Sequence, residues 1–473
     1  MKNTVNGRPS GTGLGVDVLN PATLEVVDTV NACRPEAVDA ACRAAHAALP
    51  VWAASDEARQ AALRECLKVL VDHHDELAVL LSKEQGKPLA QARQELLGSA
   101  RILQWYADVE LQESVLRDTP RERIVARRRP IGVVGLITPW NFPITILGMK
   151  LWATLRAGNT VVVKPAPTTP LTTLRYAELI ASVLPAGVVN TVTGEGLVGQ
   201  MLTTHPLVDK ISFTGSTATG RSVMANSAET LKRLTLELGG NDPAILLDDA
   251  DLDAAIPVLV RGSFHNAGQV CQAIKRVFVP TRLVDEVVER MVTVSDSYMV
   301  VGCGQDEAVT VGPVNNPAQQ RFVQDLVTDA AERGATIHEL GAVKYEGLPG
   351  YFVRPVIVTG LDASAPLVTE EQFGPALPIV AYDDLDALVD GLNADEYGLD
   401  ASVWSADEEK ALGIASRLRV GQVYVNSHAG PPDPEIPFGG VKGSGFGREL
   451  GLRGLDDVSE LQVLKVARNG GPS

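Results

Sequence analysis

The chain has 473 residues, which is too long for one ordinary hydrophobic core, so we expect two or three domains. It carries 42 Lys and Arg against 58 Asp and Glu, and its formal net charge of −16 disfavours nucleic acid or an anionic membrane as the main partner. Hydrophobic residues make up 45% and charged residues 21%, as in an ordinary globular protein.

The first residues, MKNTVNGRPSGTG, lack the apolar stretch of a secretory signal, and no run along the chain approaches the roughly 18 apolar residues of a membrane span. We therefore expect a cytoplasmic protein. The five cysteines form no CxxC pair and are an odd number, and His73 and His74 lack an HExxH pattern. These patterns predict neither a disulfide framework nor a metal site.

The N-terminal part is predicted to contain a strand and turn over 17–30, then helices over 35–49 and 56–83, with Gly86 and Pro88 ending the second helix. The segment 110–130 ends in the basic run RERIVARRRP. It is interpreted either as an edge strand or arm used in subunit pairing or as an exposed loop.

From Ile131 onward, short apolar runs alternate with helical stretches. Such alternation predicts an α/β fold with parallel, doubly wound sheets. The predicted strands are IGVVGLI, TVVVK from Thr160, VNTV from Val189, KISF from Lys210 and AILL from Ala244. A second alternating region after Asp251 has helices near 285–299 and 317–334, strands near 352–358 and 377–382, and a late strand over 459–467.

Two glycine-lined segments contain candidate reactive groups. LELGG places Glu237 only 34 residues before the Cys271 of GQVC. A thiolate can attack a carbonyl carbon, and a carboxylate can activate the water that releases the resulting thioester. These residue types indicate an enzyme, although the pair alone would also suit a hydrolase.

Three further segments follow predicted strands, where ligand loops of open α/β sheets lie. In ITPWNFP, the Asn141 amide could donate to a developing oxyanion, or it could simply satisfy loop backbone. Lys164 ends the strand TVVVK and suits an anionic or ribose-bearing ligand, or is merely solvated. FTGSTATG opens a helix with small residues but is not the GxGxxG fingerprint.

Taken together with EEQFGP and PFGGVKGSGFGRELG, these segments resemble the aldehyde dehydrogenase superfamily, from NPAT at Asn20 to Gly451. The resemblance implies two doubly wound domains plus a small β oligomerisation element. It implies an NAD(P)-binding domain over 1–109 and 131–239, a catalytic domain over 240–455, and an oligomerisation element over 110–130 and 456–473. A homodimer or homotetramer is expected.

The resemblance also implies residue roles. Cys271 matches the nucleophile, Glu237 the general base, Asn141 with the Cys271 backbone N–H the oxyanion hole, and Lys150 a lysine of structural or proton-relay function. The cofactor would be held by Thr138, Pro139, Trp140, Lys164, Gly215, Ser216, Glu371 and Phe373. The aldehyde would lie among Phe142, Ile146, Met149, Val270, Gln272 and the loop 428–436.

The cofactor is predicted to be NAD or NADP. Many NAD-preferring relatives have a glutamate three residues after the strand-end lysine, where this chain has Pro167. Without that repulsion of a 2′-phosphate, NADP use is favoured, alone or alongside NAD. The predicted substrate residues include no obvious basic side chain that could bind a substrate carboxylate. A medium-sized neutral aldehyde is therefore favoured over a semialdehyde such as succinic semialdehyde.

Three other functions are compared with a dehydrogenase that produces a carboxylic acid. An acylating enzyme would pass the thioester to coenzyme A, and Glu237 argues against it because a thiol needs no activated water. Intact Cys271, Glu237 and Asn141 argue against a binding protein without turnover. His265 could suggest a Cys-His hydrolase, but no matching triad order or GxSxG accompanies it. Cys303 is interpreted as structural.

Overall fold

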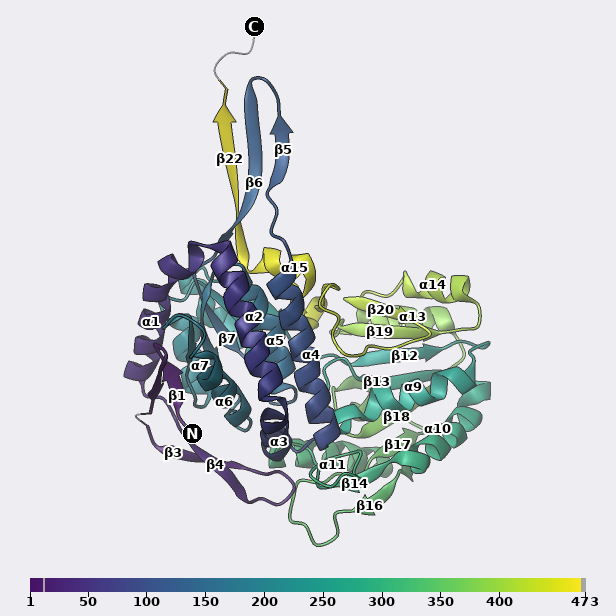
Figure 1. Cartoon of the computed structure of the whole chain (residues 1–473). Helices are drawn as coiled ribbons and strands as arrows, with labels where there is room; N and C mark the ends of the chain where they lie inside the picture. Colours follow the sequence, from purple (N-terminus) through teal and green to yellow (C-terminus); the bar gives the residue numbers. More distant parts are fainter. Residues whose placement is uncertain (12, 469–473) are drawn as a thin grey trace.

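Two sheets built mainly of parallel strands, and a three-stranded arm that projects away from both, organise the chain (Figure 1). The computed structural model describes residues 1–11 and 13–468. The architecture confirms the predicted α/β fold class. Within the described residues, no helix is long and apolar enough to cross a membrane.

The first sheet has six strands in the order β21, β11, β10, β7, β8, β9, and all neighbours are parallel except β21 with β11. Strands β7, β8 and β10 are buried along their whole length, which explains their apolar composition. Their register places Lys164 beside Ile137, and Glu237 beside Thr214, at one edge of the sheet. The strands are β7 (Val133–Ile137), β8 (Thr160–Lys164), β9 (Val189–Thr191), β10 (Lys210–Thr214), β11 (Arg233–Glu237) and β21 (Gly445–Phe446).

Eight helices accompany the strands of this first sheet or precede them in sequence. They are α1 (Pro35–Ala53), α2 (Asp56–Asp72), α3 (His74–Gln85), α4 (Leu89–Asp108), α5 (Pro143–Arg156), α6 (Leu171–Ile180), α7 (Gly196–Thr204) and α8 (Thr217–Ser227). The single helix predicted over 56–83 is wrong, because His73 leaves the helical conformation with φ −106° and ψ 13° and α3 starts after it. Helix α1 continues beyond the predicted end through Pro50, and α4 was not predicted.

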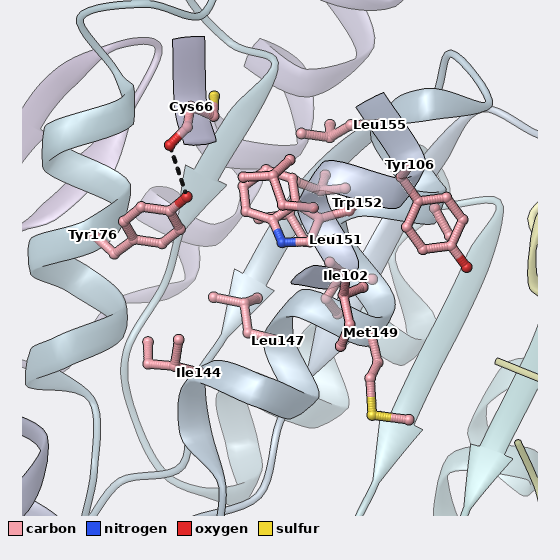
Figure 2. Packing of buried hydrophobic residues seen from close by; sticks show 14 of the residues in the cluster. Cys66, Ile102, Tyr106, Ile144, Leu147, Met149, Leu151, Trp152, Leu155 and Tyr176 are labelled. Carbon is pink, nitrogen blue, oxygen red and sulfur yellow. Dashed lines mark hydrogen bonds between the residues drawn. The ribbon is translucent and has the colours of Figure 1, made fainter. Parts of the chain in front are cut away.

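Helix α5 is the centre of the largest core cluster. Every residue of α5 is buried, and Trp152 packs edge to face with Tyr176 of α6 at a ring-centroid distance of 6.0 Å. Figure 2 shows this packing, with the Tyr176 hydroxyl donating to the backbone carbonyl of Cys66 over 3.4 Å. A helix that is buried on all sides has a fixed position, so the loop that leads into it is fixed as well.

The second sheet has seven strands in the order β15, β17, β18, β13, β12, β19, β20, with only β15 antiparallel to its neighbour. The AILL segment, grouped in sequence with the first set of strands, belongs to this sheet. The strand predicted over 352–358 begins only at Val356. The strands are β12 (Asp242–Leu246), β13 (Ile274–Pro280), β15 (Thr336–Glu339), β17 (Val356–Thr359), β18 (Ala376–Tyr382), β19 (Asp400–Trp404) and β20 (Gln422–Val425).

The helices around the second sheet agree with the two predicted ones within a few residues. They are α9 (Leu252–Phe264), α10 (Val284–Tyr298), α11 (Pro317–Glu332), α12 (Pro366–Thr369), α13 (Leu385–Ala394) and α14 (Glu408–Ala415). Helix α15 (Gly451–Asp457) instead packs against α5. Short 3-10 turns occur along the chain at η1 (Ala228–Thr230), η2 (His265–Gly268), η3 (Thr281–Leu283) and η4 (Lys442–Ser444). Three small strand pairs complete the fold: β1 (Asn3–Val5) with β2 (Arg8–Ser10), β3 (Gly15–Leu19) with β4 (Val26–Asn31), and β14 (Val300–Gly302) with β16 (Ala342–Lys344).

The segment 110–130 forms strands, as the first of its two interpretations expected. Strands β5 (Ser114–Asp118), β6 (Glu122–Pro130) and β22 (Ser459–Ala467) make an antiparallel sheet, with all nine residues of β22 paired to β6. Figure 1 shows this arm extending beyond the rest of the molecule. The last five residues of the predicted element 456–473 lie outside the described residues. The predicted domain ranges stay a prediction, and β21, within 240–455, pairs with the first sheet.

Candidate active site

Cys271 lies in a turn between η2 and β13, where the backbone is unusually constrained. Asn266, Ala267 and Gly268 have φ values of 50°, 56° and 72°, in the left-handed region. A Cβ on Gly268 would also come within 2.3 Å of the Gly374 carbonyl oxygen, so only glycine fits. Lys275 Nζ donates to the carbonyls of Val270 and, over 3.3 Å, of Cys271. Such strain is retained at functional sites.

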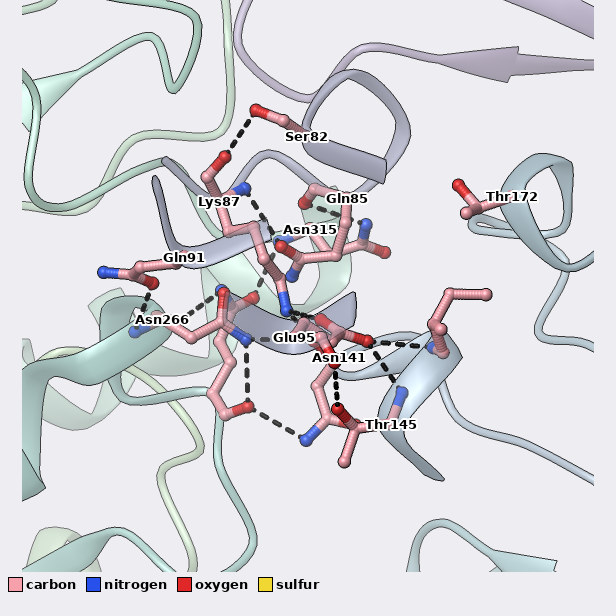
Figure 3. Close-up of polar contacts among 12 residues, drawn as sticks. Ser82, Gln85, Lys87, Gln91, Glu95, Asn141, Thr145, Thr172, Asn266 and Asn315 are labelled. Carbon is pink, nitrogen blue, oxygen red and sulfur yellow. Dashed lines mark hydrogen bonds and ion pairs between the residues drawn. The ribbon is translucent and has the colours of Figure 1, made fainter. Parts of the chain in front are cut away.

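Asn141, in the loop between β7 and α5, is tied to that turn (Figure 3). Its Nδ2 donates to the Gln269 carbonyl over 3.0 Å, and its own carbonyl accepts from Lys87 Nζ over 2.9 Å and from Asn266 Nδ2 over 3.1 Å. An amide nitrogen has two hydrogens, and only one is used within the described residues. The second is free to donate to another acceptor.

A buried ion pair supports the same loop. Lys87 Nζ pairs with Glu95, and the Glu95 carboxylate accepts from the backbone N–H groups of Ile144, over 2.8 Å, and Thr145, over 3.1 Å. Glu95 thus satisfies orphan donors at the first turn of α5. Sequence reasoning missed both residues, because nothing nearby in sequence shows that Lys87, between α3 and α4, and Glu95, on α4, face inward.

Glu237, at the end of β11, is almost fully buried, and neither carboxylate oxygen has a hydrogen-bond partner within the described residues. Burial raises the pKa of Glu237 well above its usual value, the charge of Glu449 adds to that rise, and the charge of Lys150 opposes it. Lys150 Nζ pairs with Glu449 Oε1 at 2.5 Å and donates to Ser212 Oγ at 3.1 Å. Lys150 therefore contacts Glu449 directly and acts on Glu237 only through its charge.

Cys271 and Glu237 line one cavity of about 450 Å³, which is within the range of small-molecule sites. All five residues predicted for the substrate line it, as do residues 428–432 of the predicted loop. Asn141 is buried and precedes the lining residue Phe142. Sequence reasoning missed several other lining residues, among them Gln91, Gln94, Val258, Arg261, Phe438 and Glu449. Arg261 adds a basic side chain that the predicted set of substrate residues lacks.

On the other side of the turn that holds Cys271, Glu371 lies close to the backbone of the LELGG segment. Its Oε1 accepts from the Gly240 N–H over 3.2 Å and lies 3.6 Å from Lys275 Nζ, while a Cβ on Gly239 would approach Oε2 to 2.2 Å. Phe373, with φ 45°, packs edge to face with Trp140 at a centroid distance of 5.4 Å. The segments around 140, 239 and 371 therefore meet at one place.

The strand ends of the first sheet provide a setting that fits a dinucleotide. Lys164 ends β8, its carbonyl accepts from the Thr138 N–H over 3.1 Å, and burial lowers the pKa of its amine to about 8. Ser216 caps α8 by accepting from the Thr219 N–H over 3.3 Å, and the preceding Gly215 has no room for a Cβ, which would come within 2.5 Å of the Phe213 ring. A helix N-terminus and a buried amine that follow strands of one sheet at the same edge suit a pyrophosphate and its ribose.

The sequence matches the aldehyde dehydrogenase family over residues 9–464. The chain belongs to this family. Succinate-semialdehyde dehydrogenase [NADP(+)] GabD of Escherichia coli K12 is 37% identical over 98% of this chain and 97% of its own length. Glutarate-semialdehyde dehydrogenase of Pseudomonas putida KT2440 is 36% identical, with the same coverage.

Solved structures of other aldehyde dehydrogenases and related enzymes have the same fold. An NADP-dependent enzyme of E. coli superposes with a TM-score of 0.94 at 36% identity, covering 98% of each chain. A mutant of aldehyde dehydrogenase C from Pseudomonas syringae, in complex with NAD+ and octanal, superposes with a TM-score of 0.93 at 35% identity, covering 100% of this chain and 98% of its own. This chain is therefore an aldehyde dehydrogenase that uses NAD or NADP.

His265 and Cys303, the other two candidate groups from the sequence, pack against neighbouring side chains. The His265 ring is open to the cavity on one side and stacks on Phe142 at a centroid distance of 6.0 Å, and the surrounding protein together with the Lys87 charge lowers its pKa to about 4. Cys303 packs against the core of the second sheet. In residues 1–11 and 13–468, no cluster of His, Cys, Asp or Glu could hold a metal ion.

The Cys271 thiol is expected to react slowly with alkylating agents at neutral pH. Part of the Cys271 side chain faces the cavity, but burial by the surrounding protein raises the pKa of the thiol to about 12. The charge of Lys275 opposes this rise, and the charge of Glu371 adds to it. Iodoacetamide labelling of the Cys271 peptide, followed by mass spectrometry in the cofactor-free enzyme, should therefore accelerate about tenfold per pH unit from pH 7 to 10. Lys275→Met should slow labelling at fixed pH, with Lys275→Arg as the control. A plateau below pH 9 would contradict the assignment.

Proposed function

We propose that this enzyme oxidises an aldehyde to a carboxylic acid through a thioester on Cys271, which water activated by Glu237 then hydrolyses. The observation that carries the proposal is that Cys271 and Glu237 line one cavity, while Asn141 is hydrogen-bonded to the turn that holds the nucleophile. A nucleophile, a base and an oxyanion donor are the three groups that this chemistry needs.

In the first step, Cys271 Sγ attacks the aldehyde carbon and its proton leaves. Burial raises the pKa of both the thiol and the Glu237 carboxyl, so transfer of that proton to Glu237 costs less than with an ordinary carboxylate. The tetrahedral oxyanion would accept from the free Asn141 N–H and from the Cys271 backbone N–H. Asn141 is uncharged, so it stabilises the oxyanion without an ion pair that would hold the adduct back.

The cofactor supplies the acceptor for the hydride lost by the adduct. The residues that would hold it are Thr138, Pro139, Trp140, Lys164, Gly215, Ser216, Glu371 and Phe373. Lys164 would hold the adenosine ribose, the helix start at Ser216 the pyrophosphate, and Glu371 the nicotinamide ribose. Lys275 contacts both Glu371 and the Cys271 carbonyl, and so couples the cofactor side of the site to the nucleophile turn.

Hydrolysis then needs a base close to the thioester. Glu237 has no competing hydrogen bond within the described residues, and its raised pKa makes it a stronger base once ionised. The neighbouring group of Lys150, Glu449 and Ser212 could receive the proton, since Glu449 also lines the cavity. An acylating enzyme that transfers to coenzyme A would not need such a base.

Two substrate classes occur among the similar proteins. The names of the E. coli and P. putida relatives specify semialdehydes, and the P. syringae structure contains octanal. The cavity favours the first class through one feature, the positive charge of Arg261. We therefore propose a semialdehyde in place of the neutral aldehyde favoured by sequence.

For the oligomeric state, we propose a homodimer or homotetramer assembled through the arm. Its strands expose apolar side chains to solvent, and an edge of this kind is usually covered by another chain. The exposed residues are Val115, Leu116, Leu461, Val463 and Val466. Location in the cytoplasm likewise remains a prediction.

Substitutions at the reactive pair should separate the two chemical stages. Cys271→Ala should abolish aldehyde oxidation while changing cofactor affinity less than about threefold, because the thiol is needed only for the covalent adduct. Glu237→Gln should still form about one equivalent of reduced cofactor per site, but more slowly than the wild type because Glu237 also accepts the thiol proton, and should then turn over at least a hundredfold more slowly. Stopped-flow absorbance would measure both, with Cys303→Ala as a control that keeps full turnover. Aldehyde oxidation by Cys271→Ala would overturn the proposal.

Cofactor choice should depend on Glu195 as well as on Pro167. Glu195 and the segment 165–167 line one small hollow, and the Glu195 charge acts on Lys164. We expect both NAD and NADP to bind, and Glu195→Gln to shift the ratio of dissociation constants toward NADP about threefold to tenfold, because a carboxylate repels a 2′-phosphate. Cofactor titrations by fluorescence measure the ratio. A preference of the wild type for NAD above a hundredfold would contradict the expectation that both cofactors bind.

Charges placed on the arm should weaken assembly. Leu461→Asp combined with Val463→Asp introduces two carboxylates on an exposed apolar strand, and we expect a smaller mass by light scattering coupled to size exclusion. Lys465→Glu, on the same strand, is the control for a change of charge alone. A wild-type chain that elutes as a monomer at micromolar concentration would contradict the proposal.

A further inference from the structure

We propose that Arg261 forms an anion-binding subsite in the wall of the catalytic cavity, which selects aldehydes that carry a carboxylate or sulfonate at the end remote from the carbonyl. The inference rests on the proposed function, because it concerns the cavity that contains Cys271 and Glu237. It adds a residue and a chemical class of substrate that neither the sequence motifs nor the reactive pair specify.

The position of Arg261 follows from helix α9. Arg261 lies in the last turn of this helix, and His265 follows four residues later in η2, so both lie on one side of the helix end and line the cavity. The Arg261 side chain is exposed, whereas Cys271 is only partly so. Arg261 therefore belongs to the open part of the cavity, where the far end of a substrate would lie.

The other ionisable groups of the wall are already compensated or neutral. Glu95 is paired with Lys87, and Glu449 with Lys150. Burial raises the pKa of Glu237 and so favours its neutral form, and the lowered pKa of His265, about 4, keeps the ring uncharged at neutral pH.

Arg261 itself has no ion-pair partner in the described part of the chain, where no carboxylate oxygen lies within 4.0 Å of its guanidinium. The charge of Arg261 acts on Tyr298 of α10: burial raises the pKa of this phenol, and the Arg261 charge opposes the rise. A phenol does not neutralise a guanidinium. Arg261 is thus the uncompensated charge of the cavity wall, and the wall attracts an anion.

The rest of the wall suits a short carbon chain between two polar ends. Apolar side chains predominate in the lining of the cavity, among them Ile146, Met149, Val258, Val270 and Phe438. A guanidinium presents paired N–H donors that match the two oxygens of a carboxylate. The cavity therefore has one polar end for the aldehyde, at Cys271 and Asn141, and one for an anion, at Arg261.

The test compares two substrates that differ only in charge, succinic semialdehyde and its methyl ester. For the wild type, kcat/KM should be higher for the acid. In Arg261→Met, which removes the charge but keeps an unbranched side chain, the acid-to-ester ratio of kcat/KM should fall roughly tenfold, mainly through KM for the acid. Arg261→Lys should restore part of the ratio. Gln94→Met, which removes a neutral polar group from the same wall, is the matched control and should change the ratio less than about threefold.

The outcomes separate this inference from the proposed function. A wild type that oxidises the ester as well as the acid, or an unchanged ratio in Arg261→Met, would overturn the anion subsite while leaving the dehydrogenase mechanism intact. An equal drop for both substrates would also overturn it, because the loss would not depend on charge. A wild type that oxidises neither compound nor any other aldehyde would instead contradict the proposed function. Thermal melting of each variant shows that it is folded.

Discussion

The buried ion pair between Lys87 and Glu95 is the interaction on which the site depends. Each charge has lost its water, which costs several kcal/mol per ion unless hydrogen bonds replace it. Here they do: Lys87 donates to the Asn141 carbonyl, and Glu95 accepts from two backbone N–H groups of α5. The pair therefore holds the loop that presents Asn141 against a helix that cannot move, since α5 is buried throughout. Removal of either charge would leave the other buried and alone.

From that anchor, hydrogen bonds continue toward the nucleophile. Asn141 contacts Gln269 and Asn266, which precede Cys271, and Lys275 holds the turn from the other side. The turn has three successive residues with left-handed φ, a conformation that would relax if these contacts were absent. Cys271 is thus held by Asn141, which follows a strand of the first sheet, and by Lys275, which lies on a strand of the second. Neither sheet alone contains the complete site.

The sequence predicted the parts of this structure that depend on local composition. Buried parallel strands are continuous apolar runs, and strand ends of one parallel sheet meet at one edge, so Lys164, Ser216 and Glu237 could be placed from their motifs. Contacts between distant segments were not predictable in this way. His73 interrupts a helix without a Gly or Pro beside it. Lys87, Glu195 and Arg261 have the ordinary appearance of solvated charges, and only the packing of other elements gives each of them a defined environment.

The short strand β21 has a consequence for how the enzyme acquires its activity. Residues 445 and 446 return from the far end of the chain to pair with β11, beside Glu237, and Glu449 supplies the partner of Lys150. The residues proposed as nucleophile, base and oxyanion donor are all synthesised by residue 271, yet the surroundings of Glu237 are complete only after β21 has joined the first sheet and Glu449 has reached Lys150. A nascent chain therefore contains Cys271 and Glu237 well before the groups that surround Glu237 exist, and this part of the site can form only when synthesis is nearly finished.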